Sequence, residues 1–197
     1  GTAGHADLEH AFHLFVDEQG YLKPVDERNK AKIEDTYVSQ INPNKEDMYL
    51  MLRDNLENRL LSYGEGARFM SEQIIYDSKR DLAGTVDFIA IDKEGNVNIL
   101  DWKFMDLNVD KYEDVPWFKV NAWNQQMTQY KYIISKVYGV KNENFKHTRM
   151  IPIKAYYSKG NKTKKILPYL INIKIGDVDV QNIKEDYFFQ TYGASKS

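Results

Sequence analysis

The chain of 197 residues contains no cysteine. The protein therefore has no disulfide framework, no thiolate zinc site and no cysteine-ligated iron–sulfur cluster. It also lacks an apolar run as long as a transmembrane helix, and it shows no basic start followed by an apolar signal core. We therefore expect an intracellular, cytoplasmic protein with no membrane partner.

Glycine-rich and nucleophile motifs are absent as well. The chain has no Gly-x-Ser-x-Gly, no Walker-type loop and no dinucleotide-binding glycine pattern. These absences argue against a serine hydrolase, an NTPase and a Rossmann oxidoreductase.

An excess of positive charge is missing too, because the formal net charge is −2 at pH 7. Small nucleic-acid-binding modules are often basic overall, so any basic surface here has to be local. The candidate lysines are Lys159, Lys162, Lys164 and Lys165 in one polar loop, and Lys119, Lys131 and Lys136 around a predicted helix. Lysine runs are more often solvated loops than binding surfaces. Faces for base stacking could come from Trp117, Trp123, Tyr156 and Tyr157, but most aromatic residues are expected to be core or half-buried, so no stacking residue is assigned.

The length fits one domain over residues 1–197, either complete or cut from a longer protein. Apolar spacing predicts helices at 5–15, 27–40, 45–62 and 117–138, with Asn44 as a cap and Gly139 as a helix end. Strands are predicted at 68–76, 82–91, 97–104, 149–157 and 166–175, and a last helix at 180–189. The polar, acidic stretch 106–116 is expected to be a loop that gates a site.

The most informative pattern is a predicted hairpin with an acidic residue at each end. Four apolar residues follow Asp87, then comes the glycine-containing turn 92–96, and a second short strand leads to Asp101. If the turn is centred near Glu94, Asp87 lies opposite Asp101, with their Cβ atoms about 5 Å apart. Facing like charges destabilise a sheet, and a divalent cation between them would remove that cost.

The triplet Asp101-Trp102-Lys103 ends this hairpin. Side chains alternate faces along a strand, so Asp101 and Lys103 share one face while Trp102 packs inward. Carboxylate oxygens suit magnesium or manganese, and such an ion generates hydroxide from water near neutral pH. Lys103 would orient or deprotonate that water. Chance alone gives about 0.7 Asp-x-Lys matches in a chain of this length. The triplet therefore indicates a site only together with its hairpin partner Asp87.

Glu72 is a further candidate carboxylate. A turn centred near Lys79 places Glu72 within about one residue of Asp87 across the ladder. A register shift of one residue would turn Glu72 to the opposite face, so both positions remain open.

Gln126 and Tyr130 are four residues apart on a predicted helix and share one of its faces. An amide can donate to a phosphate or hold a carboxylate, and a phenol can do either through its hydroxyl. The alternative is that Tyr130 packs in the core and Gln126 is an ordinary polar residue.

Together these segments resemble the PD-(D/E)XK nuclease superfamily, and within it the RecB-like branch. That branch has a histidine on its first helix, a Gly-x-x-Asp before the Asp-x-Lys, and a Gln-x-x-x-Tyr on the next helix. The matching segments here are 1–9 around His5, 84–87, 101–103 and 126–130, in the order of the family. They span about two thirds of the chain, and the ordered set is more specific than any one motif.

The resemblance implies a restriction-endonuclease-like α/β fold, with a central mixed sheet of a three-strand meander, a helix and further strands, flanked by helices. It assigns His5, Asp87, Asp101, the Trp102 backbone carbonyl and Glu72 to a magnesium or manganese ion. It assigns Lys103, Gln126 and Tyr130 to the nucleophile and the substrate. The other interpretation of His5 is an exposed residue of a fraying or non-native start, since Gly1 and Thr2 precede it closely.

The activity implied by the resemblance is hydrolysis of DNA phosphodiester bonds by a metal-activated water, with exonuclease action favoured. The implied setting is DNA end processing, recombination or repair, with a helicase or another recombination protein in the same chain or complex. A phage enzyme would act in the host cytoplasm. Relatives with an iron–sulfur cluster, including most CRISPR-associated members, are excluded because this chain has no cysteine. The alternatives are a non-catalytic nucleic-acid-binding module with a nuclease fold and a site-specific endonuclease of the same superfamily.

Overall fold

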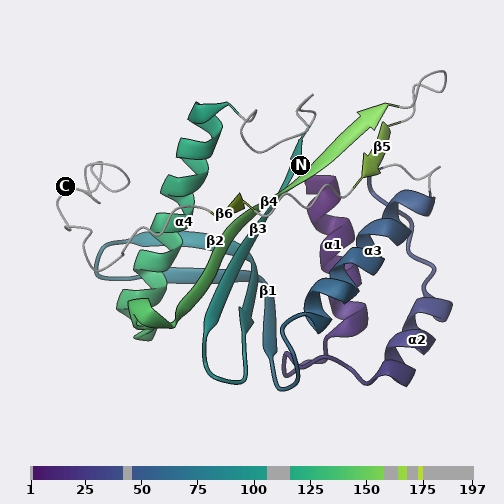
Figure 1. Cartoon of the computed structure of the whole chain (residues 1–197), viewed down its shortest axis with the longest axis horizontal. Coiled ribbons are helices and arrows are strands. Elements are labelled where there is room, and N and C mark those ends of the chain that lie inside the picture. The colour runs from purple at the N-terminus through teal and green to yellow at the C-terminus, as the bar shows by residue number, and fades with distance from the viewer. Residues whose placement is uncertain (1, 42–45, 106–115, 158–163, 168–172, 175–197) are drawn as a thin grey trace.

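The computed structural model describes residues 2–41, 46–105, 116–157, 164–167 and 173–174 (Figure 1). The expected cap at Asn44, most of the expected gating loop, the lysines at 159 and 162 and the expected last helix lie outside these ranges. The helices are α1 (Thr2–Phe15), α2 (Val25–Glu34), α3 (Glu46–Leu61) and α4 (Trp117–Tyr138), with a short 3-10 helix at Asn142–Asn144. The strands are β1 (Arg68–Asp77), β2 (Leu82–Ile91), β3 (Val97–Met105), β4 (Phe145–Tyr157), β5 (Lys164–Leu167) and β6 (Ile173–Lys174).

The strands form a mixed sheet in the order β1-β2-β3-β4-β5, and β6 also pairs with β4. The first three strands are an antiparallel meander. The chain then crosses over through α4, so β4 lies parallel to β3, as parallel pairs require a long connection. The architecture is therefore α/β, with a mixed sheet flanked by helices.

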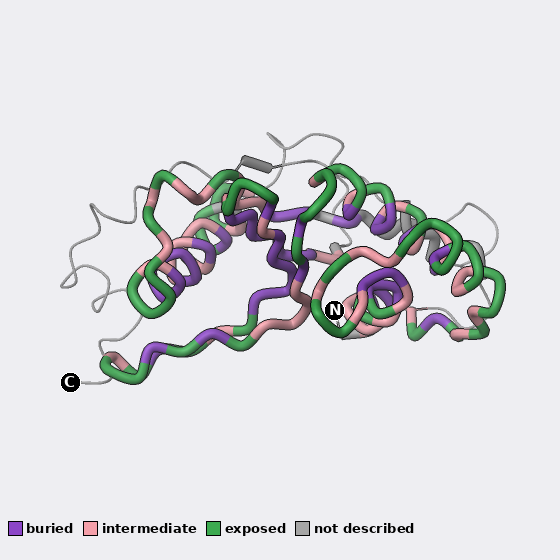
Figure 2. Tube along the Cα trace, turned by 90° about the horizontal axis from the view of Figure 1, so that it is seen from below, coloured by how far each residue is buried: buried purple, intermediate pink, exposed green. Residues whose placement is uncertain are grey.

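Two apolar cores fill the space on either side of the sheet. Helices α1 and α3 cover one face and α4 covers the other (Figure 1). Helix α1 turns one stripe inward because Leu8, Phe12 and Phe15 recur at helical spacing. Buried residues follow the central strands and the inner sides of the helices (Figure 2).

Most predicted elements agree with the structure to within one or two residues. The meander strands and α4 are confirmed, and Gly139 ends α4 in the left-handed conformation with φ +71°. β4 begins four residues earlier than predicted, and the predicted strand at 166–175 contains two short strands, β5 and β6.

The predicted helix at 27–40 is too long, because α2 ends at Glu34. The Asp35 carboxylate accepts a hydrogen bond from the Tyr37 amide at 3.1 Å, a local turn that competes with the helix. Buried Asp7 on α1 then accepts hydrogen bonds from the Tyr37 hydroxyl and the Gln40 amide. These bonds hold the segment after α2 in a non-helical path against α1.

No helix in the described part of the chain is long and apolar enough to cross a membrane.

Candidate active site

The candidate site lies where β2 and β3 part. Their ladder runs from Ile91–Val97 to Phe88–Leu100 and stops there. The next pair in the same register is Asp87 and Asp101, as the hairpin predicted. Beyond this point β2 stays with β1, while β3 continues beside β4 (Figure 1). The carboxylates therefore stand at the mouth of a gap between two diverging strands.

Two peptide groups of the backbone at Trp102, its amide and its carbonyl, make polar contacts at this point. The Trp102 amide donates to Asp87 Oδ2 at 2.9 Å, and the Trp102 carbonyl lies 2.8 Å from His5 Nε2. His5 Nε2 is also 3.1 Å from Asp87 Oδ2. Because both partners are acceptors, Nε2 carries the proton. The hydrogen bond with Asp87 raises the pKa of His5, against the opposing effect of burial.

A glycine allows α1 to approach β3 this closely. A Cβ at Gly4 would collide with the ring of Phe104, which also packs edge-on against His5 at 5.6 Å between centroids. The sequence motif contained Gly4, but its steric role was not predicted. The small residues around His5 could have predicted this close approach, since a helix can come close to a strand only where its side chains are small.

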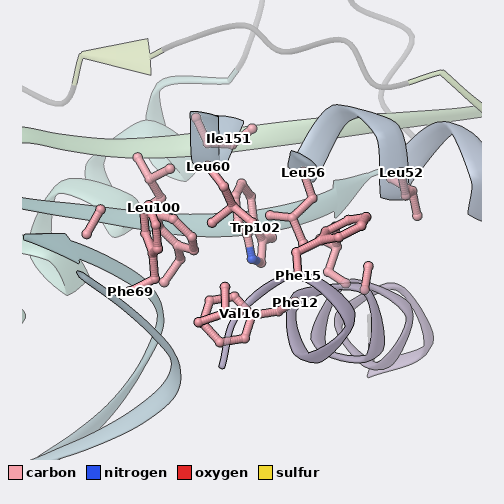
Figure 3. Packing of buried hydrophobic residues seen from close by; sticks show 14 of the residues in the cluster. Phe12, Phe15, Val16, Leu52, Leu56, Leu60, Phe69, Leu100, Trp102 and Ile151 are labelled. Carbon is pink, nitrogen blue, oxygen red and sulfur yellow. The ribbon is translucent and has the colours of Figure 1, made fainter. Parts of the chain in front are cut away.

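The Trp102 side chain points away from the gap, as its strand position predicted. It lies in the core with α1 and α3, next to Phe88 at 5.6 Å between ring centroids. Figure 3 shows its ring among side chains from α1, α3 and the sheet. Asp101 and Lys103, on either side of Trp102, point to the opposite face, toward α4.

The two aspartates have opposite pKa shifts. Burial and the neighbouring Asp87 raise the pKa of Asp101 to about 7. Burial also acts to raise the pKa of Asp87, but hydrogen bonds from His5, Asp101 and the Trp102 amide outweigh it and hold that pKa below its usual value. Without a cation the pair therefore holds one proton, mainly on Asp101, near neutral pH.

Lys103 is held by a chain of contacts that ends at β2. Its Nζ lies 2.9 Å from Asp101 Oδ2 and donates to Gln126 Oε1 at 3.3 Å. Gln126 Nε2 donates to the Tyr130 hydroxyl at 2.8 Å, which donates to the Thr85 carbonyl at 3.0 Å. Burial, followed by the charge of Asp101, raises the pKa of Tyr130 to about 12, so the hydroxyl keeps its proton.

The first glycine of the Gly-x-x-Asp segment makes room for this chain. A Cβ at Gly84 would lie 2.6 Å from the Tyr130 ring, closer than any real contact. Both interpretations of Tyr130 apply: its ring is buried in the core, and its hydroxyl reaches the site. The Thr85 carbonyl was not predicted, since no side-chain pattern marks a backbone acceptor.

Glu72 lies on the site side of β1. The β1–β2 ladder pairs Ser71 with Phe88 and Gln73 with Val86, which puts Glu72 across from Asp87. Glu72 itself has φ +49° and interrupts the pairing. Burial and the charge of Asp87 raise the pKa of Glu72. The predicted turn centre near Lys79 is thus correct, and the strained backbone adds a feature that the sequence did not show.

A cation is compatible with these residues. Asp101 Oδ2 is buried and has no hydrogen bond of ordinary geometry, although Lys103 Nζ is near. His5 Nε2 lies 2.8 Å from Trp102 O and 3.1 Å from Asp87 Oδ2, so these three donor atoms are already close together, joined by hydrogen bonds. Among the described residues, no three His, Asp or Glu side chains form a ready-made metal-binding group. A metal ion at these residues would therefore need the Trp102 carbonyl as a further donor, and His5 would have to lose its proton to join the donor set.

Of the lysines and aromatic residues that the sequence suggested for nucleic-acid contact, only some are exposed. Lys131 is buried, with its Nζ 5.4 Å from the Phe145 ring centroid, and Trp123 is buried in the α4 core, so neither belongs to an exposed binding surface. Trp117 is 78% exposed. The side chains of Tyr156, Tyr157, Lys164 and Lys165 lie outside the described part of the structure. His10 stacks on Tyr37 and pairs with Asp35, and His13 is exposed.

Comparisons with protein families, curated proteins and solved structures found no match to this chain.

Proposed function

We propose that the protein is a metal-dependent DNA nuclease of the PD-(D/E)XK type, of the RecB-like branch, with a restriction-endonuclease-like core. The observation that carries the proposal is that the fold brings His5, Asp87 and the Trp102 carbonyl together with the Asp101–Lys103 ion pair where β2 leaves β3. Two buried carboxylates side by side are costly unless a cation or a proton neutralises one of them. The ordered motifs and the mixed sheet, with its meander and crossover helix, support the same proposal.

In this mechanism Asp87, Asp101, His5 and the Trp102 carbonyl hold magnesium or manganese, and Glu72 contributes a carboxylate at the edge. Bound there, the ion supplies a Lewis acid for the phosphate and a water of lowered pKa. Asp101 gives up its proton when the site is loaded, which its pKa of about 7 makes easy near neutral pH.

Lys103 is the residue that faces the reacting groups. Its ammonium is held between Asp101 and Gln126, so it is positioned to orient the attacking water and to donate to the phosphate. Gln126 and Tyr130 fix Lys103 through the contacts to Thr85, and this preorganisation lowers the cost of reaching the transition state. The expected setting is DNA end processing, recombination or repair, with a helicase or other recombination protein as a partner.

Cleavage assays test the proposal. Linear and circular DNA, single- and double-stranded, would be incubated with magnesium or manganese. We expect cleavage that EDTA abolishes. Lys103→Ala should reduce the rate about 100-fold or more, the range typical of a lost transition-state contact. Lys141→Ala, which removes an exposed lysine outside the site, should keep the wild-type rate.

The substrate panel also separates the alternatives. Cleavage restricted to linear DNA supports an exonuclease, whereas cleavage of circles at fixed positions supports a site-specific endonuclease. Binding of DNA with no cleavage under any metal condition would sink the enzyme proposal and favour a non-catalytic binding module. Equal activity of Lys103→Ala and Lys141→Ala would remove Lys103 from the mechanism.

A further inference from the structure

A second polar pocket lies on the other face of the sheet from the aspartate pair. It has a volume of about 200 Å³ and lies between the end of α3, the β2–β3 turn and the start of β4. Asn98 in its wall is three residues before Asp101 on β3, so the two side chains point to opposite faces, about 10 Å apart along the strand. Leu60 and Leu100, next to the pocket residues Arg59 and Asn98, belong to the core of α1 and α3 (Figure 3). The pocket thus lies at the edge of that core.

Positive charge dominates this pocket. Arg59, Lys146 and Arg149 line it, and among its described lining residues Asp92 is the only carboxylate. Asp92 Oδ1 already accepts hydrogen bonds from the Glu94 and Asn96 amides at 3.0 and 2.9 Å, and Lys146 Nζ is 3.8 Å from Oδ2. Asp92 is therefore held by its own turn, and Lys146 Nζ lies beyond hydrogen-bonding distance of it.

The cations converge on one region. Burial raises the pKa of the Tyr63 phenol, while Arg59 and Arg149 both act to lower it, which places both guanidinium groups near this side chain. They come from α3 and β4, elements about 90 residues apart in the chain. Like charges brought together by a fold repel one another, and a bound anion would remove that repulsion.

Two buried polar atoms in the lining residues lack partners. Arg149 Nε has no hydrogen-bond acceptor, although its Nη2 lies 3.1 Å from His147 Nδ1. Asn98 is 1% exposed, and its Nδ2 donates to the Ala90 carbonyl at 3.2 Å. That bond fixes the orientation of the amide, so the unpartnered Asn98 Oδ1 is an acceptor. An unsatisfied buried donor and an unsatisfied buried acceptor are each costly.

These observations define the ligand by its chemistry. Cations and a free N–H require anionic oxygens, and Asn98 Oδ1 requires a hydroxyl or another donor on the same molecule. The volume is below the usual range of about 300–1,000 Å³ for drug-sized ligands, so the ligand has few atoms. We propose that this pocket binds a small hydroxyl-bearing oxyanion of the phosphate class, namely hydrogen phosphate or a hydroxylated phosphomonoester. The proposal does not depend on the nuclease function.

Calorimetric titration of the full chain with inorganic phosphate tests this site, at pH 7.5 and constant ionic strength. We expect saturable binding at one site. Lys146→Gln and Arg149→Gln should each weaken it about tenfold or more, the loss expected for one charge-assisted hydrogen bond. Lys30→Gln makes the same charge change at an exposed position on α2 and should leave the affinity unchanged. Lys146 is exposed, so its variant keeps the test valid if Arg149→Gln does not fold.

Sulfate and DNA are the discriminating ligands. Sulfate has the charge of hydrogen phosphate but no hydroxyl, so it should bind more weakly; equal affinities would contradict the role of Asn98. Absence of phosphate binding to the wild type would overturn the proposal. It would also be overturned if Lys30→Gln weakened binding as much as Lys146→Gln. If a short duplex DNA bound and lost affinity in the Lys146 and Arg149 variants while phosphate did not bind, the pocket would instead be a nucleic-acid contact.

Discussion

Asp101 is 3% exposed and lies beside a second carboxylate, so its protonation is linked to folding. Its pKa of about 7 in the folded protein is above the ordinary value of 3.8. Between these values the folded state holds a proton that the unfolded chain releases. The free energy of unfolding therefore falls as the pH rises from about 4 to 7. The lowered pKa of Asp87 acts only below pH 3.8, outside this window.

Asp101→Asn should remove the Asp101 part of this pH dependence, while the raised pKa values of His5 and Glu72 leave a smaller dependence of the same sign. In EDTA, we expect the wild type to lose on the order of 2 kcal/mol between pH 5 and pH 7.5, less than the full value of a three-unit shift because the proton is shared with Asp87. The asparagine variant should show a flatter profile and higher stability at pH 7.5. Urea unfolding at several pH values measures both, with exposed Asp54→Asn as the matched control. Parallel profiles for wild type and Asp101→Asn would show that Asp101 titrates normally.

Gly84 is required by the Tyr130 ring rather than by its own backbone, since its φ is not in the left-handed region. Gly84→Ala should displace Tyr130 and destabilise the fold by about 1–3 kcal/mol, the usual cost of overpacking. In a Tyr130→Ala background the added methyl group has room, so the same change should cost little. Denaturant unfolding of the four proteins forms a double-mutant cycle. An equal cost in both backgrounds would exclude the steric explanation.

At the scale of the elements, the β1–β2 hairpin contains a strained residue at the edge of the candidate site. Glu72 has φ +49°, a conformation that costs a non-glycine residue about 1–2 kcal/mol. Strain at such a position is often retained because it directs a functional side chain. Here it breaks the ladder opposite Asp87, and the Glu72 carboxylate lies near enough to respond to the charges of Asp87 and His5.

Glycine substitutions at Ser71 and Glu72 distinguish the cost of backbone strain at Glu72 from the ordinary cost of glycine in a strand. Ser71→Gly, in regular ladder geometry, should destabilise the protein by about 0.5–1 kcal/mol. Glu72→Gly should be neutral or stabilising, because relief of strain offsets the same entropic cost. Thermal and urea unfolding at pH 7 compare the two. Equal losses would mean that Glu72 is not strained in solution.

The elements also show why some predictions succeeded. Strand order in the meander and the pairing of Asp87 with Asp101 depend on period-two patterns and on turns of a few residues, which are local features. The length of α2 was wrong because Asp35 and Asp7 redirect the chain through side-chain hydrogen bonds, and helical spacing does not report those.

At the scale of the whole molecule, the least predictable contacts join distant segments. His5 meets the Trp102 carbonyl across 97 residues, and Tyr130 meets the Thr85 carbonyl across 45. Both acceptors are backbone groups, so residue identity does not mark them. The basic pocket escaped prediction for a related reason. Arg59, Asn98 and Arg149 come from three elements, whereas the sequence analysis named other lysines, of which Lys131 is buried.

The chain of contacts from Lys103 through Gln126 and Tyr130 to Thr85 has a consequence during protein synthesis. His5 is made first and Tyr130 last, 125 residues later, which corresponds to roughly 6–25 s at ordinary rates of translation. Until α4 leaves the ribosome, a nascent chain contains both aspartates and Lys103 but lacks the helix that holds the lysine in place. Every shorter fragment is therefore incomplete at this site, and the assembled site first appears together with the second core of the fold.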